Sequence, residues 1–253
     1  MIENLLVLNS DKTHLMVLAS SHKHRKYGNF SIQLDTGTEI IAPQESEVLL
    51  GVTLSNNFLW NQHIRDGERN MMASLSKKNV ALANIAKITS FKTRLMIGSG
   101  LMMSAIAYAI QTYGACSAYL ANMLQVQQNT AARHITQLPW MTPTATLLQQ
   151  CNWLSIKQLI VYHSLVLLHK VMICNKPEYI FNKMKPPHRE TRNADNLTLY
   201  DRRSFKTTTA AKSFIPRAIS EWNSLPFELR EVASFATFKH KLKLHVKDKI
   251  PMK

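Results

Sequence analysis

Alternating apolar and polar residues in the first sixty positions predict β-strands. Residues 30–34 place Phe30, Ile32 and Leu34 on one side of an extended chain, with the period of two that a half-buried strand has. Turn-forming residues follow at 35–38, so we expect a hairpin that ends near residue 41. A strand that is apolar on both faces is expected over 14–18. Another is expected over 48–54, with these side chains on one face: Val48, Leu50, Val52 and Leu54.

From about residue 61 the apolar period lengthens to that of an α-helix. Helices are expected over about 61–87, 92–112 and 117–136, and a long, largely buried helix over 154–174. Near the end of the chain, Ser234 is placed to cap a helix. The apolar stripe of this helix consists of Phe235, Phe238, Leu242 and Val246, and its other faces carry Lys239, Lys241, Lys243 and Lys247.

These patterns predict a mainly α (α+β) fold with a small β-hairpin region at the N-terminus. We expect three parts, at residues 1–57, 58–138 and 139–253. Residues 186–212 lack periodicity and are rich in polar and basic side chains, so we expect a basic linker there.

The charge balance favours a polyanionic partner. A hydrophobic content of 45% with 19% charged residues is typical of a folded protein. The 31 Lys and Arg residues outnumber the 16 Asp and Glu residues, which gives a net charge of +15. Residues 1–160 carry 13 basic and 8 acidic groups (+5), whereas residues 161–253 carry 18 and 8 (+10), so the excess lies toward the C-terminus.

Cysteine usage and hydropathy predict neither a metal site nor a membrane span. Cys116, Cys151 and Cys174 are widely spaced and lack zinc-finger spacing. The most apolar stretch, 95–110, is interrupted by glycines and serines, and it is shorter than the ~20 residues that a bilayer span needs. We therefore expect an intracellular protein, in the nucleus or the cytoplasm, without a membrane partner.

Five short blocks of residues occur in a fixed order along the chain. The blocks are Leu8, Asn9, Lys12 and Thr13; Leu50, Gly51, Val52, Trp60, His63 and Ile64; Gln125, Gln127, Asn129, Ala132 and Arg133; Trp153, Leu154 and Ile156; and Phe214, Ala218, Trp222, Asn223, Leu225 and Pro226. Each block is weak alone, but together they extend over nearly the whole chain. In this order they resemble the region after the catalytic palm of reverse transcriptases from non-LTR (LINE-type) retrotransposons.

The resemblance implies the end of a palm, a primer grip at Leu50, Gly51 and Val52, a thumb-like helical bundle and a downstream region. In the family, two Mg²⁺ ions are held by aspartates that lie N-terminal to the position matched by Asn9, and no two aspartates are adjacent in this chain. We therefore expect a fragment without its N-terminal polymerase half, without a metal site or cofactor of its own, and without activity as it stands. Lys12 matches a family lysine that acts as a general acid, a role that requires an intact parent enzyme.

Basic side chains are the remaining candidates for function. In a thumb they would face the phosphates of an RNA or DNA template-primer and bind without reading sequence. The candidates are Lys77, Lys78, Lys92, Arg94, Arg133, Arg202 and Arg203. Two alternatives to a polymerase fragment stay open: a non-catalytic basic RNA- or DNA-binding module, and a helical protein-interaction domain whose charge is incidental.

Overall fold

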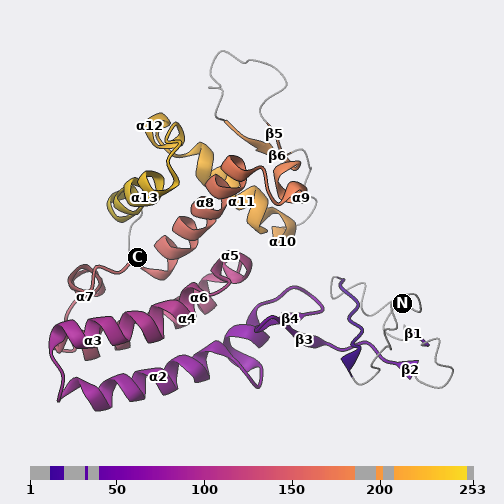
Figure 1. Cartoon of the computed structure of the whole chain (residues 1–253). Coiled ribbons are helices and arrows are strands. Elements are labelled where there is room, and N and C mark those ends of the chain that lie inside the picture. The colour runs from indigo at the N-terminus through magenta and orange to yellow at the C-terminus, as the bar shows by residue number, and fades with distance from the viewer. Residues whose placement is uncertain (1–11, 20–31, 34–39, 186–197, 202–207, 250–253) are drawn as a thin grey trace, which may run out of the picture. The chain divides into compact units, whose positions relative to one another are not determined.

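The computed structural model describes residues 12–19, 32–33, 40–185, 198–201 and 208–249. The described chain is mainly helical with small two-stranded antiparallel sheets, as the sequence predicts (Figure 1). Contacts divide the chain into two compact units, residues 1–74 and 75–253. The three-part division expected from the sequence stays a prediction.

The first unit contains two short hairpins. Strands β1 (Ile32–Gln33) and β2 (Ile40–Ile41) are antiparallel, with Ile32 opposite Ile41. This confirms that the two expected strands pair, although their connecting turn lies outside the described residues. The strand expected over 14–18 is wrong, because Leu15 forms only one isolated bridge, to Pro43.

The second hairpin corrects the strand expected over 48–54. Strands β3 (Ser46–Leu49) and β4 (Val52–Ser55) are antiparallel, so Leu50 and Gly51 form the turn between them. Their φ angles are 49° and 77°, and a two-residue type I′ turn needs positive φ at both positions. Glycine adopts this conformation without strain, which explains why an alternating apolar pattern folds back on itself here.

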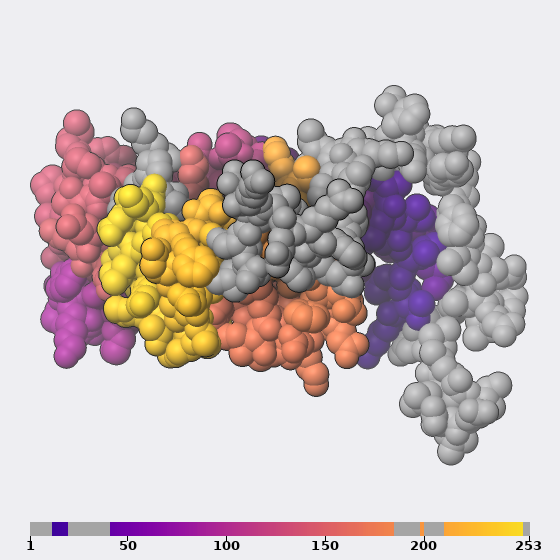
Figure 2. Space-filling model, turned by 90° about the horizontal axis from the view of Figure 1, so that it is seen from above, coloured from indigo at the N-terminus to yellow at the C-terminus, as the bar shows by residue number. Residues whose placement is uncertain are grey.

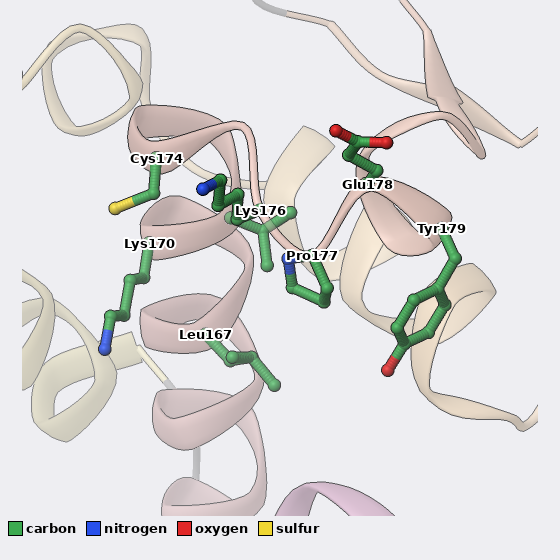
Figure 3. Close-up of a pocket in the computed structure, with 8 residues that line it drawn as sticks. Leu167, Lys170, Cys174, Lys176, Pro177, Glu178 and Tyr179 are labelled. Atoms are coloured by element: carbon green, nitrogen blue, oxygen red, sulfur yellow. The ribbon is translucent and has the colours of Figure 1, made fainter. Parts of the chain in front are cut away.

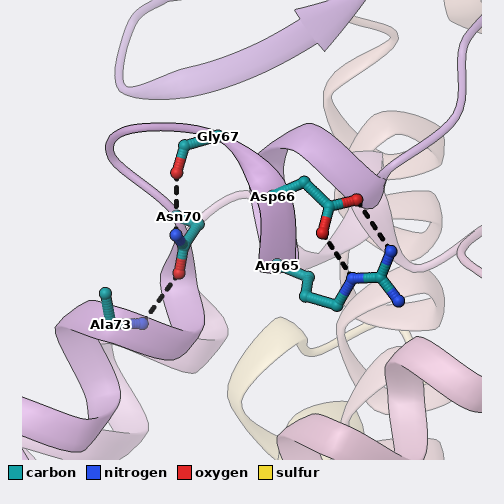
Figure 4. Close-up of polar contacts among 5 residues, drawn as sticks. All are labelled: Arg65, Asp66, Gly67, Asn70 and Ala73. Carbon is teal, nitrogen blue, oxygen red and sulfur yellow. Dashed lines mark hydrogen bonds and ion pairs between the residues drawn. The ribbon is translucent and has the colours of Figure 1, made fainter.

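The helix expected over 61–87 is broken near residue 67. A π-helical turn, η3 (Gln62–Asp66), ends where the amide of Gly67 donates to the carbonyl of Gln62 at 2.9 Å. A Cβ at Gly67 would lie 2.4 Å from that oxygen, so only glycine fits. Asn70 then caps α2 (Met71–Ala86): its Oδ1 accepts from the amide of Ala73 at 2.8 Å, and its Nδ2 donates to the Gly67 carbonyl at 2.7 Å (Figure 4).

Helix α2 spans the boundary between the two units, and an antiparallel pair of helical segments follows it in the second unit. One segment consists of α3 (Phe91–Gly98), η4 (Ser99–Met103) and α4 (Ser104–Ala107), followed by α5 (Ile110–Tyr113). The other is α6 (Ala118–Thr136), which packs on α3. The helix expected over 117–136 is confirmed, and its apolar stripe of Leu120, Leu124, Ala131 and Ile135 is buried.

Uncharged polar residues connect α6 to its neighbours. Gln125 Oε1 accepts from the amide of Ile156 at 2.9 Å, and Gln128 Nε2 donates to the carbonyl of Leu154 at 2.8 Å. Asn129 Nδ2 donates to Thr144 Oγ1 at 3.0 Å, at the start of α7 (Thr144–Gln150). Two of these amides satisfy backbone groups, and Gln128 is itself fully buried, so part of the polar face of α6 serves packing within the protein.

Helix α8 (Ile156–Cys174) lies at the centre of the second unit and contacts α5, α6, α11 and α13 (Figure 1). A capping box between Ser155 and Gln158 fixes its start. Among the described helices, α8 alone is long and apolar enough to cross a membrane, with a mean hydropathy of 1.3. Half of that apolar window is buried inside the protein, which is the pattern of a core helix.

The rest of the unit packs along α8, where α11 and α13 make most of the contacts. The described elements are α9 (Glu178–Phe181), β5 (Met184–Lys185), β6 (Tyr200–Asp201), α10 (Thr208–Ala211), α11 (Phe214–Asn223), α12 (Phe227–Arg230) and α13 (Phe235–Lys249). The expected linker is partly structured, because β6 pairs with β5. The side chain of Asn223 holds Leu199 by accepting from its amide at 3.0 Å and donating to its carbonyl at 2.8 Å.

Candidate nucleic-acid interface

Helix α13 has the amphipathic pattern that the sequence predicts. Phe238, Leu242 and Val246 are fully buried, and α13 packs on α8. The ring of Phe238 stacks on His169 of α8 with centroids 3.8 Å apart. His169 Nε2 in turn donates to the carbonyl of Val232 at 2.7 Å. The apolar face of α13 is therefore fixed, which fixes the direction in which its lysines point.

Three of these lysines form what we call the basic stripe: Lys239, Lys243 and Lys247. They are spaced four residues apart on one flank of α13, so neighbouring side chains start about 6 Å apart. Lys239 is exposed, and the other two are partly buried. None of the three pairs with an acidic residue in the described part of the chain, although the ammonium of Lys247 donates to Asn152 Oδ1. Helix α13, yellow in Figure 2, contributes to the surface seen there.

The positive charges along the stripe repel one another and the nearby His163. Burial and the nearby ammonium of Lys247 lower the pKa of Lys243. Burial and the ammonium of Lys239 lower the pKa of His163 on α8. Like charges four residues apart destabilise a helix. An anion bound here would relieve this repulsion, which makes the stripe a candidate site for phosphate groups.

The stripe also lies in a chain with an unusual lack of acidic residues. No Asp or Glu occurs between Glu68 and Glu178, a segment that covers α2 to α8. The same segment contains ten basic residues: Arg69, Lys77, Lys78, Lys87, Lys92, Arg94, Arg133, Lys157, Lys170 and Lys176. A scan of the sequence for acid-free stretches finds this segment, which the charge balance between residues 1–160 and 161–253 hides.

The candidates on the first helices of the second unit have different environments. Lys77 on α2 and Lys92 on α3 are exposed, and Lys78 is partly exposed. These three remain accessible to a polyanion.

The prediction that Arg94 binds phosphate is wrong. Its side chain is only 7% exposed. Its Nε donates to the carbonyl of Ile135 at 2.8 Å, and its Nη1 donates to the carbonyls of Ala86, at 3.0 Å, and Thr89. The guanidinium joins the turn after α2 to the end of α6 and cannot reach a phosphate.

Arg133 lies at the end of α6, with its guanidinium 4.5 Å from the ring centroid of Trp140. Its Nε is buried and has no hydrogen-bond partner. The indole ring therefore takes the place that a carboxylate usually has beside a partly buried arginine.

The primer-grip-like residues lie at the tip of the β3–β4 hairpin. Leu50 is 83% exposed and Gly51 is exposed, whereas Val52 is buried. Lys12 is exposed at the edge of the described chain. Arg202 and Arg203 lie outside the described residues.

A surface hollow in the described chain is a weaker candidate for a ligand site. A hollow of about 800 Å³ lies beside the C-terminal end of α8, with Lys170, Cys174, Lys176 and Tyr179 around it (Figure 3). All four of these residues are exposed, so it is an open depression and not an enclosed ligand cavity.

Within the described residues, no three His, Cys, Asp or Glu side chains gather where they could hold a metal ion. The described cysteines are free, and burial raises the pKa of Cys116 and of Cys151 to about 11. A thiol with a raised pKa is a poor nucleophile near neutral pH. Comparisons of this chain with protein-family models, with curated proteins and with solved structures give no match.

Proposed function

We propose that this chain is the part of a non-LTR retrotransposon reverse transcriptase that follows the catalytic palm, and that it holds RNA or DNA through phosphates. The order of the five sequence blocks supports the family. The basic stripe of α13 is the observation that carries the binding role, because three cations lie on a rigid helix without acidic partners among the described residues.

Two further features support this proposal. The helices from α2 to α8 come from a segment without a single carboxylate side chain, so no negative charge of their own opposes an approaching polyanion. Leu50 and Gly51 lie at an exposed hairpin tip, and the apolar side chain of Leu50 is 83% exposed there, where a primer end could contact it.

The proposed role is binding and not polymerisation. In the family, the magnesium ions are held by aspartates before the position matched by Asn9, so an intact parent enzyme would take Mg²⁺ through residues upstream of this region. The open reading frame upstream of Met1 tests the family directly. We expect an aromatic-x-Asp-Asp sequence there, and its absence from the adjoining DNA would count against the proposal.

The binding role is tested by titrating the protein with labelled duplex DNA and RNA at several salt concentrations. The logarithm of the association constant should fall linearly with the logarithm of salt concentration. Replacing Lys239, Lys243 and Lys247 together by Gln should reduce the slope by about 2 to 3, because each phosphate contact contributes about 0.7 to 0.9.

A matched variant removes the same charge elsewhere on the second unit. Lys170, Lys176 and Lys212 are exposed, so their triple replacement by Gln tests whether net charge alone matters. We expect a much smaller change in slope. Equal slopes for the two triple variants would contradict the assignment to α13, and salt-independent binding by the unmodified protein would contradict the proposed function itself.

A further inference from the structure

Trp140 is the most exposed tryptophan that the structure describes. Its side chain is 75% exposed, whereas Trp153 is 6% exposed and Trp222 is fully buried. The guanidinium of Arg133 covers one face of the Trp140 ring at 4.5 Å from the centroid. The exposed area therefore includes the opposite face, which is a flat aromatic surface open to a ligand.

Two hydrogen bonds shape the backbone between Arg133 and Thr142, which carries Trp140. Gln137 ends α6 with φ 56°, and its amide donates to the carbonyl of Arg133 at 2.8 Å. Thr142 closes a turn around Trp140 by donating its amide to the carbonyl of Pro139 at 3.0 Å. The ring and the guanidinium thus come from two ends of one hydrogen-bonded segment, and the contact between them orients the indole.

Cations from a second segment lie at the same end of the helical unit. Gln137 Nε2 donates to the carbonyl of Ala86 at 2.8 Å, so the end of α6 contacts the turn between α2 and α3. That turn and the start of α3 carry Lys87 and Lys92, both exposed. The two segments therefore combine aromatic surface with positive charge, and both lie in the stretch without Asp or Glu.

An exposed indole together with positive charge favours some classes of ligand over others. A duplex presents phosphates but keeps its bases stacked inside, so a flat indole has nothing to contact. A single strand presents both phosphates and unpaired bases, and aromatic side chains in positively charged grooves are the usual way in which proteins hold it. A protein partner could use the ring together with Ile88 and Met141, which are exposed on the same two segments, but it would need acidic side chains to match Lys87 and Lys92.

We propose that Trp140, backed by Arg133, stacks on an unpaired base of single-stranded RNA or DNA. This inference rests on the proposed function, and it adds a preference for single strands that the basic stripe alone does not provide. The stripe acts through charge, whereas the platform formed by Trp140 and Arg133 acts through stacking, so the two contributions respond differently to salt.

The test compares Trp140→Ala, Trp140→Phe and Tyr119→Ala in titrations with a 20-nucleotide single strand, as DNA and as RNA, and with a 20-base-pair duplex. Tyr119 is a matched control because it is an aromatic residue 59% exposed on α6 of the same unit. Trp140→Ala should weaken single-strand binding by roughly 5- to 150-fold, the range for one stacked base. Duplex binding should change less than about twofold, and the salt slope should stay the same because no phosphate contact is lost.

Trp140→Phe should keep most of the affinity, and Tyr119→Ala should keep all of it. Circular dichroism should be unchanged in all three variants, and the unfolding free energy should fall by no more than about 1 kcal/mol, because both positions are exposed and Trp140→Ala loses only the contact with Arg133. If the protein binds both ligands and Trp140→Ala binds single strands as tightly as the unmodified protein, the platform is wrong while the proposed function stands. Equal losses for duplex and single strand would also overturn it. If the unmodified protein binds neither ligand, the proposed function itself fails.

Discussion

Two arginines in the interior of the helical unit use their charge to bind the protein itself. Arg94 donates to three backbone carbonyls, those of Ala86, Thr89 and Ile135. Arg217 donates to the carbonyl of Gln111 at 3.2 Å, and its Nε lies 4.0 Å from Glu221. Part of the net charge of +15 is therefore structural and does not contribute to a surface for a polyanion.

Replacing Arg94 by Met tests this structural role. The variant leaves three carbonyls without their donor in a buried position, so we expect the free energy of unfolding to fall by about 3 kcal/mol. Lys92→Met on the same helix is the control, because Lys92 is exposed, and its change should stay within about 0.5 kcal/mol. Urea unfolding measures both. Similar small losses for the two variants would contradict the assignment.

The burial of Arg94 could not be predicted from the sequence. Its position near the start of an expected helix is that of a surface residue in a thumb. The partner that turns it inward is the carbonyl of Ile135, 41 residues further along the chain. No local spacing encodes this contact, because it depends on how α3 packs against α6. Exposed candidates such as Lys77 and Lys92 have no such long-range constraint, and their exposure follows from helical periodicity alone.

Glu221 should make stability depend on pH. Burial raises its pKa from 4.5 to about 7, and the guanidinium of Arg217 opposes this shift. Because the folded protein then binds a proton that the unfolded chain has released between these two values, stability falls as pH rises from about 4.5 to about 7.

Glu221→Gln removes that titration. Relative to the variant, the unmodified protein should lose on the order of 2 kcal/mol of unfolding free energy between pH 5 and pH 8. The histidines titrate in both proteins, so their effects cancel in the difference. Parallel pH profiles for the two proteins would show that Glu221 is ionised throughout this range.

At the scale of elements, the sequence predicts helices in which apolar residues recur at a regular spacing. It does not predict the points at which that spacing is interrupted. The expected helices over 117–136 and 154–174 correspond to α6 and α8, and the expected cap and stripe of α13 are confirmed. The break at Gly67 and the turn at Leu50 depend on single residues that tolerate special backbone conformations. An apolar residue at a positive φ gives no sign of itself in a pattern of alternating hydrophobicity.

The basic stripe of α13 should lower the stability of its own helix. Two pairs of like charges four residues apart, Lys239 with Lys243 and Lys243 with Lys247, each cost about 0.2 to 0.5 kcal/mol. The triple replacement by Gln should therefore leave thermal stability unchanged or raise the unfolding free energy by up to about 1 kcal/mol at low salt. The gain should disappear in high salt because screening removes the repulsion.

Thermal unfolding at two salt concentrations measures this effect. A variant that binds nucleic acid less tightly yet is at least as stable would separate a binding role from a structural one. A loss of stability in the triple variant would instead indicate that these lysines hold α13 in place, and its weaker binding would then carry no information about phosphate contacts.

At the scale of the whole molecule, buried apolar residues are distributed unevenly between the two units. In the described part of residues 1–74, the buried apolar side chains are Val52, Ile64 and Met71, and the rest of the described core belongs to residues 75–253. The first unit also exposes Val48, Leu49 and Leu50 around one hairpin turn. A two-stranded hairpin with so small a core is marginally stable in water.

Hydrogen exchange should therefore separate the two units. Amides in the interiors of α6 and α8 should open with a free energy of roughly 5 kcal/mol or more, close to that of global unfolding. Amides that pair β3 with β4 should open at roughly 2 kcal/mol or less, because few buried contacts have to break. Mass spectrometry of peptides covering 46–55 and 156–174 measures both in one experiment, with peptide 118–136 as a second report on the helical core.

Equal protection of the hairpin and of α8 would contradict this account. It would require further apolar contacts on Val48 and Leu49, whose side chains are 46% and 59% exposed. If protection of the hairpin rises only when single-stranded nucleic acid is added, the exposed tip at Leu50 takes part in binding. The proposed primer grip would behave in this way, because a bound ligand stabilises the folded hairpin.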